Sequence, residues 1–147
     1  MKIKPLRIIE LAAREAERAR HVQHRFGAVL YRGSSILATA HNFNHIHSEH
    51  AVLNQAWRSD VRGSTMCVIR ILKSGQAGMA MPCDVCLKRM VQAGLKRVIY
   101  SNQEGDLDFI KLTGLVLDNE HVEYPYLRHH RGHLSHDRYR WGKDINT

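Results

Sequence analysis

One apolar, β-prone stretch, residues 66–72 (MCVIRIL), constrains the fold more than any other feature of the sequence. Such a run is typical of a strand that is buried on both faces, because half-exposed strands alternate apolar and polar residues. Segments with helical periodicity stand before and after it, so helix and strand alternate along the chain. Because a strand–helix–strand crossover returns the chain in the same direction, the later strands are expected to run parallel. The sequence therefore predicts a three-layer α/β/α domain with a mixed sheet of about five strands.

The other elements are predicted from periodicity and from turn residues. Apolar residues recur three or four apart from Pro5 to about Gln23, which predicts a first helix. Two short β-prone stretches, 27–31 and 36–40, flank a turn that contains Gly33, which predicts a hairpin. Gly94 is placed as the C-cap residue of a helix that begins at Cys83. The further expected elements are helices at 48–58, 83–93 and 106–112, and strands at 96–100 and 115–122.

Length and composition predict a single domain over residues 1–147. A chain of 147 residues that is 44% hydrophobic can bury one core. No apolar run could span a membrane, and the first residues do not resemble a secretory signal, so we expect a cytoplasmic protein without a membrane partner. Thiols stay reduced there, which favours metal binding or burial over disulfides. Cys67, inside the apolar stretch, is expected to be a small buried hydrophobe without a chemical role.

Two cysteines lie three residues apart where a loop enters the helix at 83–93. Pro82 suits the first turn of a helix, so Cys83 and Cys86 would project from that turn and could reach one ion. Peptide dipoles at a helix N-terminus stabilise the thiolates that zinc requires. A thioredoxin-like redox pair has the same spacing, but such a pair follows a first strand, whereas this one comes late in the chain.

A third zinc ligand is available at the start of the helix at 48–58. His45, His47 and His50 are the candidates, and the residues alone do not decide among them. Glu49 stands two positions after His47. This glutamate can be interpreted as a neighbour of the metal only if His47 is the ligand. Side chains two positions apart on a helix point in directions about 200° apart. Those of His47 and Glu49 can therefore both face one site only if the site lies beyond the helix end. Two helices could therefore meet end-on at one metal.

These two motifs together resemble the zinc-binding signature H-x-E…P-C-x-x-C of cytidine deaminase-like enzymes. The likeness extends from about residue 12 to residue 101. Within it, residues 26–30 resemble the family's first strand, and residues 36–42 resemble its second strand, which ends in a substrate-binding asparagine. A histidine as the first ligand is similar to the branch that holds deoxycytidylate, tRNA adenosine, guanine and APOBEC deaminases. The sequence departs from the family pattern at Ser48, where alanine is usual, and in the loop of only four residues between Asn42 and His47.

The resemblance implies a zinc-dependent hydrolysis of the exocyclic amine of a nucleobase. Zn²⁺ would be held by His47, Cys83 and Cys86, which leaves a coordination position for water. Glu49 would take a proton from that water and pass it to the ring nitrogen and then to the leaving ammonia. The substrate-binding residues that the resemblance implies are Asn42, Phe26, Gly27 and Ala28.

Cytosine in single-stranded DNA or RNA is the expected substrate. The compact domain and the short loop after Asn42 resemble deoxycytidylate-type and polynucleotide cytosine deaminases. The net charge of +8 favours a polyanionic partner. The C-terminal segment 121–147 interleaves aromatic, basic and histidine residues, as single-strand-binding surfaces do, although its aromatic residues could equally pack against the sheet. The candidate nucleic-acid contacts are Arg128, Arg131, Arg138, Tyr139, Arg140 and Trp141.

Three other functions stay open at this point. A deoxycytidylate deaminase acting on the free nucleotide needs only one local phosphate pocket, and a tRNA adenosine deaminase needs room for a purine. A non-enzymatic alternative is a nucleic-acid-binding module that keeps zinc for stability. The presence of Glu49 argues against that module, because a protein that only binds nucleic acid does not need a proton carrier. A homo-oligomer is compatible with the sequence. Candidates for the fourth ligand of a structural zinc site are His121, His129, His130, His133 and His136.

Overall fold

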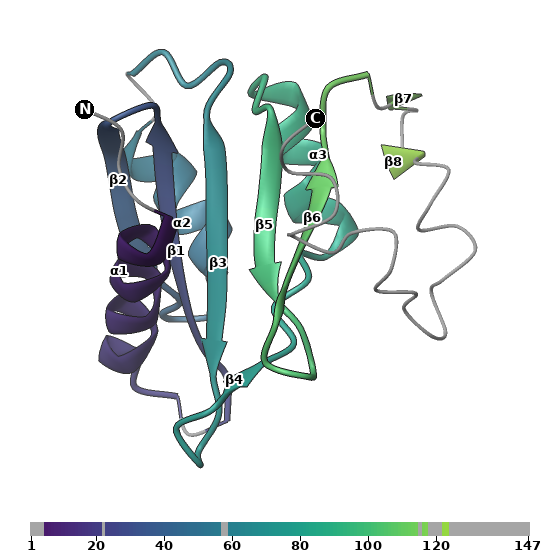
Figure 1. Ribbon diagram of the computed structural model, residues 1–147. Coiled ribbons are helices and arrows are strands. Elements are labelled where there is room, and N and C mark those ends of the chain that lie inside the picture. Colours follow the sequence, from purple (N-terminus) through teal and green to yellow (C-terminus); the bar gives the residue numbers. More distant parts are fainter. Residues whose placement is uncertain (1–4, 22, 57–58, 115, 118–121, 124–147) are drawn as a thin grey trace.

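The computed structural model describes residues 5–21, 23–56, 59–114, 116–117 and 122–123. Its helices are α1 (Pro5–Arg18), α2 (Ser48–Gln55) and α3 (Asp84–Gln92). Its main sheet has the order β2-β1-β3-β5-β6, with β4 paired to β3 (Figure 1). Strands β3 and β5 run parallel, as predicted, whereas the other pairs are antiparallel. The strands of this sheet are β1 (Arg25–Arg32), β2 (Ser35–His41), β3 (Thr65–Ile71), β4 (Ala77–Gly78), β5 (Arg97–Ser101) and β6 (Leu107–Lys111).

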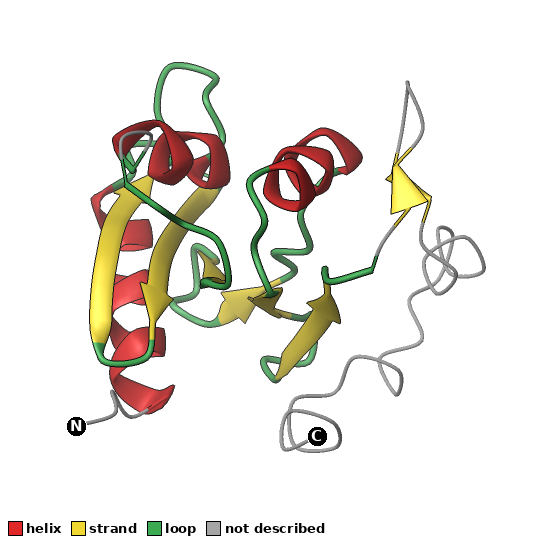
Figure 2. Cartoon of the chain, turned by 90° about the horizontal axis from the view of Figure 1, so that it is seen from above, coloured by secondary structure: helices red, strands yellow, loops and turns green. Residues whose placement is uncertain are grey.

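Helices cover both faces of the sheet. Helix α1 packs on one face against β1 and β3, and α2 and α3 lie on the other (Figures 1 and 2). Alternate residues of β3 enter the two layers: Met66 and Val68 pack on the side of α2 and α3, and Cys67 and Ile69 pack under α1. The predicted three-layer α/β/α fold with a mixed sheet is confirmed. Cys67 is 1% exposed, as expected of a buried hydrophobe.

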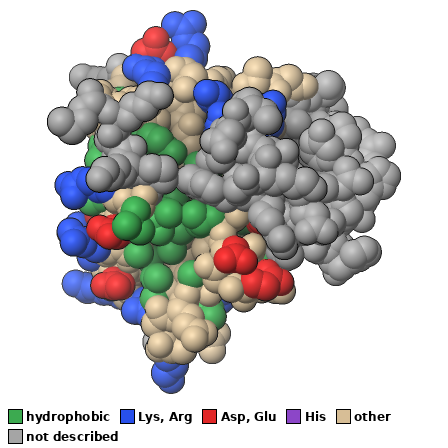
Figure 3. All heavy atoms as spheres, viewed as in Figure 1, with side chains coloured by type: hydrophobic (Ala, Val, Ile, Leu, Met, Phe, Trp, Pro, Cys, Tyr) green, Lys and Arg blue, Asp and Glu red, His purple; other side chains and the backbone are tan. Residues whose placement is uncertain are grey.

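Helix α1 lies unusually close to β1 because its inner face is made of small residues. Ile8, Ala12 and Ala16 are four residues apart and are buried against the sheet. Opposite them stands Gly27, where a Cβ atom would lie 2.0 Å from the backbone oxygen of Ala12. Most charged residues of α1 are exposed, whereas the side chain of Glu15 turns toward the sheet and contacts Nδ1 of His41 at 3.1 Å. Figure 3 shows apolar side chains gathered beside the helix, with basic side chains along the adjacent edge.

Replacing Gly27 with Ala should therefore destabilise the protein strongly. The added methyl group meets backbone atoms of α1, which cannot rotate away, so helix and strand must separate. We expect a loss of about 3 kcal/mol in the free energy of unfolding, measured by urea denaturation. Gly33→Ala is the matched control, because nothing lies within 4 Å of its Cβ position and only its positive φ of 59° opposes the change. Equal losses in the two variants would contradict the packing argument.

The prediction of a helix at residues 106–112 is wrong, because this segment is the edge strand β6. A tight turn joins it to β5: the side-chain oxygen of Asn102 accepts hydrogen bonds from the backbone N–H groups of Glu104 and Asp106, and Gly105 has a φ of 82°. Every residue of β6 pairs with β5. The turn residues Asn102 and Gly105 favour a hairpin, because a helix in this segment would have to begin after a longer loop.

Two other predicted elements also differ from those observed. Helix α1 ends at Arg18 instead of near Gln23. The strand predicted at 115–122 corresponds, in the described residues, to the short antiparallel pair β7 (Val116–Leu117) and β8 (Val122–Glu123). None of the described helices is long and apolar enough to cross a lipid bilayer.

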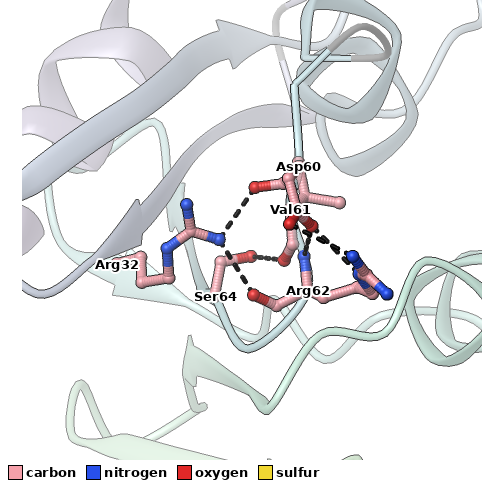
Figure 4. Close-up of polar contacts among 5 residues, drawn as sticks. All are labelled: Arg32, Asp60, Val61, Arg62 and Ser64. Atoms are coloured by element: carbon pink, nitrogen blue, oxygen red, sulfur yellow. Dashed lines mark hydrogen bonds and ion pairs between the residues drawn. The ribbon is translucent and has the colours of Figure 1, made fainter.

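The connection that leads into β3 is fixed by polar contacts with β1 (Figure 4). Arg32 donates hydrogen bonds to the backbone oxygens of Asp60 and Arg62, at 2.8 and 2.9 Å. The hydroxyl of Ser64, a fully buried residue, donates to the backbone oxygen of Val61. These bonds satisfy backbone groups of the loop and place the start of the central strand.

Candidate metal centre and substrate pocket

The N-termini of α2 and α3 carry the candidate metal ligands. His47 and Cys83 are the residues immediately before these helices, and both have extended backbones, with φ of −66° and −73°. Cys86 lies in the first turn of α3 and is fully buried. Side chains of both helix starts therefore reach one point, and the helix dipoles favour negative charge there.

Three donor atoms converge at this point. The Nδ1 atom of His47 lies 3.4 Å from the sulfur of Cys86 and 3.8 Å from the sulfur of Cys83. All three donor atoms lie within 4.8 Å of one another. One imidazole and two thiolates are a donor set that zinc prefers, and three protein ligands are typical of catalytic zinc. Among the described residues, no other group of three His, Cys, Asp or Glu side chains converges in this way.

Each of the two thiols changes the pKa of the other. A hydrogen bond from Cys86 lowers the pKa of Cys83 to about 5, and backbone N–H groups of the first helical turn and His47 act in the same direction. The same hydrogen bond, together with burial, raises the pKa of Cys86. Cys83 is thus the first thiolate of the pair, and a bound cation would favour the second.

Glu49 is a buried carboxyl group beside the donors. It is 5% exposed, and burial raises its pKa, while hydrogen bonds from the backbone and from Ser48 lower it again. The hydroxyl of Ser48 donates to Oε1 of Glu49 at 2.9 Å. A buried carboxyl with a raised pKa is better suited to general acid–base catalysis than a fully solvated carboxylate.

The structure does not include the other two candidate histidines in this group of donors. His45 is exposed in the tight turn between Phe43 and Ile46, with a φ of 67°. His50 receives a hydrogen bond on Nδ1 from Arg89 at 3.0 Å, and burial together with this guanidinium lowers its pKa. Arg89 also donates to Asn54, so it joins α3 to α2.

A pocket of about 1000 Å³ opens in front of these groups. His47, Ser48, Glu49 and Cys83 line one wall, so the donors face a space that a small molecule can enter. The other lining residues come mainly from the segment between α1 and β1, the start of β1, the end of β2 and the loop that follows it. These residues are Arg20, His21, His24, Phe26, His41, Asn42, Phe43, Asn44, His45 and Ile46, and Met81 completes the lining.

Of the predicted substrate-binding residues, Phe26 and Asn42 line this pocket, and Gly27 and Ala28 are not among the residues that line it. The side chain of Asn42 accepts a hydrogen bond from the backbone N–H of Phe26 at 2.9 Å and donates to the backbone oxygen of His24 at 2.6 Å. Asn42 therefore joins the end of β2 to the start of β1 within this part of the pocket lining. Gly27 instead faces α1, and Ala28 is a core residue.

Sequence reasoning missed the residues that line the pocket between α1 and β1. Arg20, His21 and His24 have no motif spacing, so no pattern in the chain marks them as a set. The one available signal was the density of histidines at 21–24 and 41–47, on both sides of the predicted hairpin. The proposed nucleic-acid contacts at 128–141 and the histidines of the C-terminal segment lie outside the described residues.

Comparisons with known proteins agree with this geometry. The family described as the cytidine and deoxycytidylate deaminase zinc-binding region matches residues 3–102. A search of curated protein sequences found no match.

Several solved structures have the same fold. One is the apo dCMP deaminase from the cyanophage S-TIM5, at 24% identity and a TM-score of 0.53, over 69% of this chain and 86% of that chain. The cytidine deaminase from Burkholderia pseudomallei has 20% identity and a TM-score of 0.58, over 75% and 94% of the two chains. A structure from a study of A-to-I editing by tRNA:A34 deaminases has 25% identity and a TM-score of 0.51, over 67% and 76%.

The family match covers more than half of the chain and includes the three donors and Glu49. The protein therefore belongs to the cytidine and deoxycytidylate deaminase family and is a zinc-dependent hydrolytic deaminase.

Proposed function

We propose that the protein converts cytosine to uracil in single-stranded DNA or RNA, with zinc held by His47, Cys83 and Cys86. The observation that carries this proposal is that His47, Cys83 and the buried Glu49 line one pocket. A structural zinc site would turn its ligands inward and would have no use for a buried carboxyl beside an open cavity.

Zinc and Glu49 have different roles in the proposed reaction. Zinc, when bound by three protein ligands, lowers the pKa of water to about 7 and so supplies a nucleophile at neutral pH. Glu49 would take one proton of the water and deliver it to the ring nitrogen, and would then carry the second proton, from the hydroxyl group now bonded to the carbon, to the exocyclic amine. The water oxygen bonds to the amine-bearing carbon, the carbon–nitrogen bond breaks, and ammonia leaves. One water molecule is consumed for each ammonia released.

The part of the pocket wall formed by residues 20–46 supports a polynucleotide substrate. Arg20 is exposed there, and four histidines accompany it: His21, His24, His41 and His45. Glu49 is the one acidic side chain among the described lining residues. Cationic and imidazole groups spread over two chain segments can contact more than one phosphate, which a mononucleotide does not provide.

Aromatic rings in the same wall support stacking of bases next to the target. The rings of His24 and Phe26 are stacked, with centroids 6.5 Å apart and an interplanar angle of 9°. Phe43 is 48% exposed at the pocket, which is unusual for a side chain of its size. Exposed rings beside basic groups are the usual means of binding single strands without reading their sequence.

The substrate can be tested directly by mass spectrometry. The purified protein is incubated with deoxycytidine monophosphate, with cytosine-containing single-stranded DNA and RNA, and with an adenosine-containing tRNA anticodon stem-loop. Deamination adds about one mass unit to each product. We expect conversion of the cytosine oligonucleotides. Conversion of the mononucleotide alone, or of the adenosine substrate alone, would contradict the proposed substrate without affecting the zinc chemistry.

Salt dependence tests the contribution of Arg20 to phosphate binding. Each phosphate contact with a single strand contributes about 0.7 to the slope of log affinity against log salt. Arg20→Ala should therefore weaken oligonucleotide binding and reduce this slope by about 0.7, measured by fluorescence anisotropy. Arg7→Ala removes the same charge from the exposed face of α1 and should leave the slope nearly unchanged. Equal slopes for the Arg20 variant and the unmodified protein would exclude this contact.

A further inference from the structure

Ser48 stands between the histidine donor and the buried carboxyl, in the position where the family pattern usually has alanine. It is the first residue of α2, it is fully buried, and it contributes to the lining of the pocket. A buried hydroxyl group is costly unless it makes a hydrogen bond, so its presence calls for a partner.

The partner of this hydroxyl is the carboxyl group of Glu49. The Oγ–Oε1 distance of 2.9 Å is that of a normal hydrogen bond, and an ionised carboxylate can only accept, so the hydroxyl donates. This contact joins neighbouring residues at the same helix start, where the backbone of α2 holds both. The bond therefore fixes the orientation of the carboxyl group relative to α2, the helix that begins immediately after His47.

The orientation of Glu49 matters because a carboxylate is free to turn about its last torsion angle. Terminal torsions of this kind have broad, roughly two-fold preferences, so packing alone defines them poorly. Holding Oε1 in place also directs Oε2. Proton transfer requires the acceptor oxygen within about 2.6–3.2 Å of its partner, and a displacement of about 1 Å can lower a rate about a hundredfold.

We infer that Ser48 is a positioning residue that holds one oxygen of Glu49 and directs the other toward water and the base. This inference rests on the proposed role of Glu49 as the proton carrier. Ser48 itself does not touch the reacting atoms, and it acts through the carboxyl group.

Replacement of Ser48 by Ala restores the residue usual in the family and removes only the hydroxyl. We expect kcat on the converted substrate to fall about tenfold to a hundredfold, with KM within about twofold and zinc content unchanged. Ser48→Thr, which keeps the donor, should recover most of the lost kcat. Ser64→Ala is the matched control, because it removes another fully buried hydroxyl that bonds only within its own loop (Figure 4). A Ser48→Ala enzyme with kcat within about twofold of the unmodified protein would overturn the inference.

A double-mutant cycle separates positioning from a general structural role. In the Glu49→Gln background, removing the Ser48 hydroxyl should change the residual kcat by less than about twofold, because the group it positions is no longer a proton carrier. An equal fall in kcat in both backgrounds would show that Ser48 does not act through Glu49. The cycle uses whichever substrate is converted, so a wrong base assignment does not affect it. Full activity of the single Glu49→Gln variant would instead overturn the proposed function.

Discussion

Replacing Glu49 with Gln is expected to lower kcat by about 100- to 10,000-fold while the protein keeps its zinc. Gln has the same shape as Glu, but its amide cannot take and return a proton, and general acid–base catalysis contributes this range of rate. Zinc should stay bound, because the donors are His47, Cys83 and Cys86 and the carboxyl group is not among them. Steady-state kinetics on the converted substrate and metal analysis of the same preparation measure the two effects.

The fold should not suffer from this change. Burial raises the pKa of Glu49, which means that the folded chain disfavours the charged form relative to the unfolded chain. A neutral amide therefore avoids a desolvation cost, and we expect an unchanged or slightly higher Tm. Glu10→Gln is the matched control, since it removes the same charge from the exposed face of α1 and should keep full activity. Activity of the Glu49 variant near that of this control would rule out the proposed mechanism.

Replacing Cys86 with Ser should remove both zinc and activity. Cys86 is fully buried, its sulfur lies 3.4 Å from His47, and a serine hydroxyl is a poor substitute for a thiolate ligand. Because loss of an outer-shell partner already lowers metal affinity or activity about 10- to 100-fold, loss of a direct ligand should exceed that effect. Zinc per chain, measured by atomic emission after gel filtration, should fall to a small fraction of that in the unmodified protein.

Cys67→Ser provides the control for this experiment. Cys67 is as deeply buried as Cys86, and burial raises the pKa of its thiol to about 12, but it lies under α1 on the opposite face of the sheet. This variant should lose some stability because a polar group replaces a buried thiol, while it keeps zinc and turnover. Zinc bound normally by the Cys86 variant, or lost from the Cys67 variant, would contradict the assigned ligand set.

Much of the fold could be predicted because strong local signals agree with the tertiary structure. The apolar stretch at 66–72 became β3, the central strand, and the helix that ends before Gly94 became α3. The segment at 106–112 was misassigned because so short a stretch can satisfy either periodicity. Its strand conformation depends on pairing with β5 across the turn at Asn102, a contact between elements that local periodicity does not report.

The sequence by itself determined the chemistry of the site, whereas the tertiary structure decided its geometry. The types and spacing of His47, Glu49, Cys83 and Cys86 carry the zinc and proton chemistry, because donor identity is a local property of each side chain. Only the fold brings His47, and not His45 or His50, to the two thiols. It also brings the segment that follows α1 to the same pocket as His47 and Cys83, and it directs the hydroxyl of Ser48 to Glu49. These features depend on how α1, α2 and α3 pack on the two faces of one sheet, and such distances between remote segments are set by packing in three dimensions.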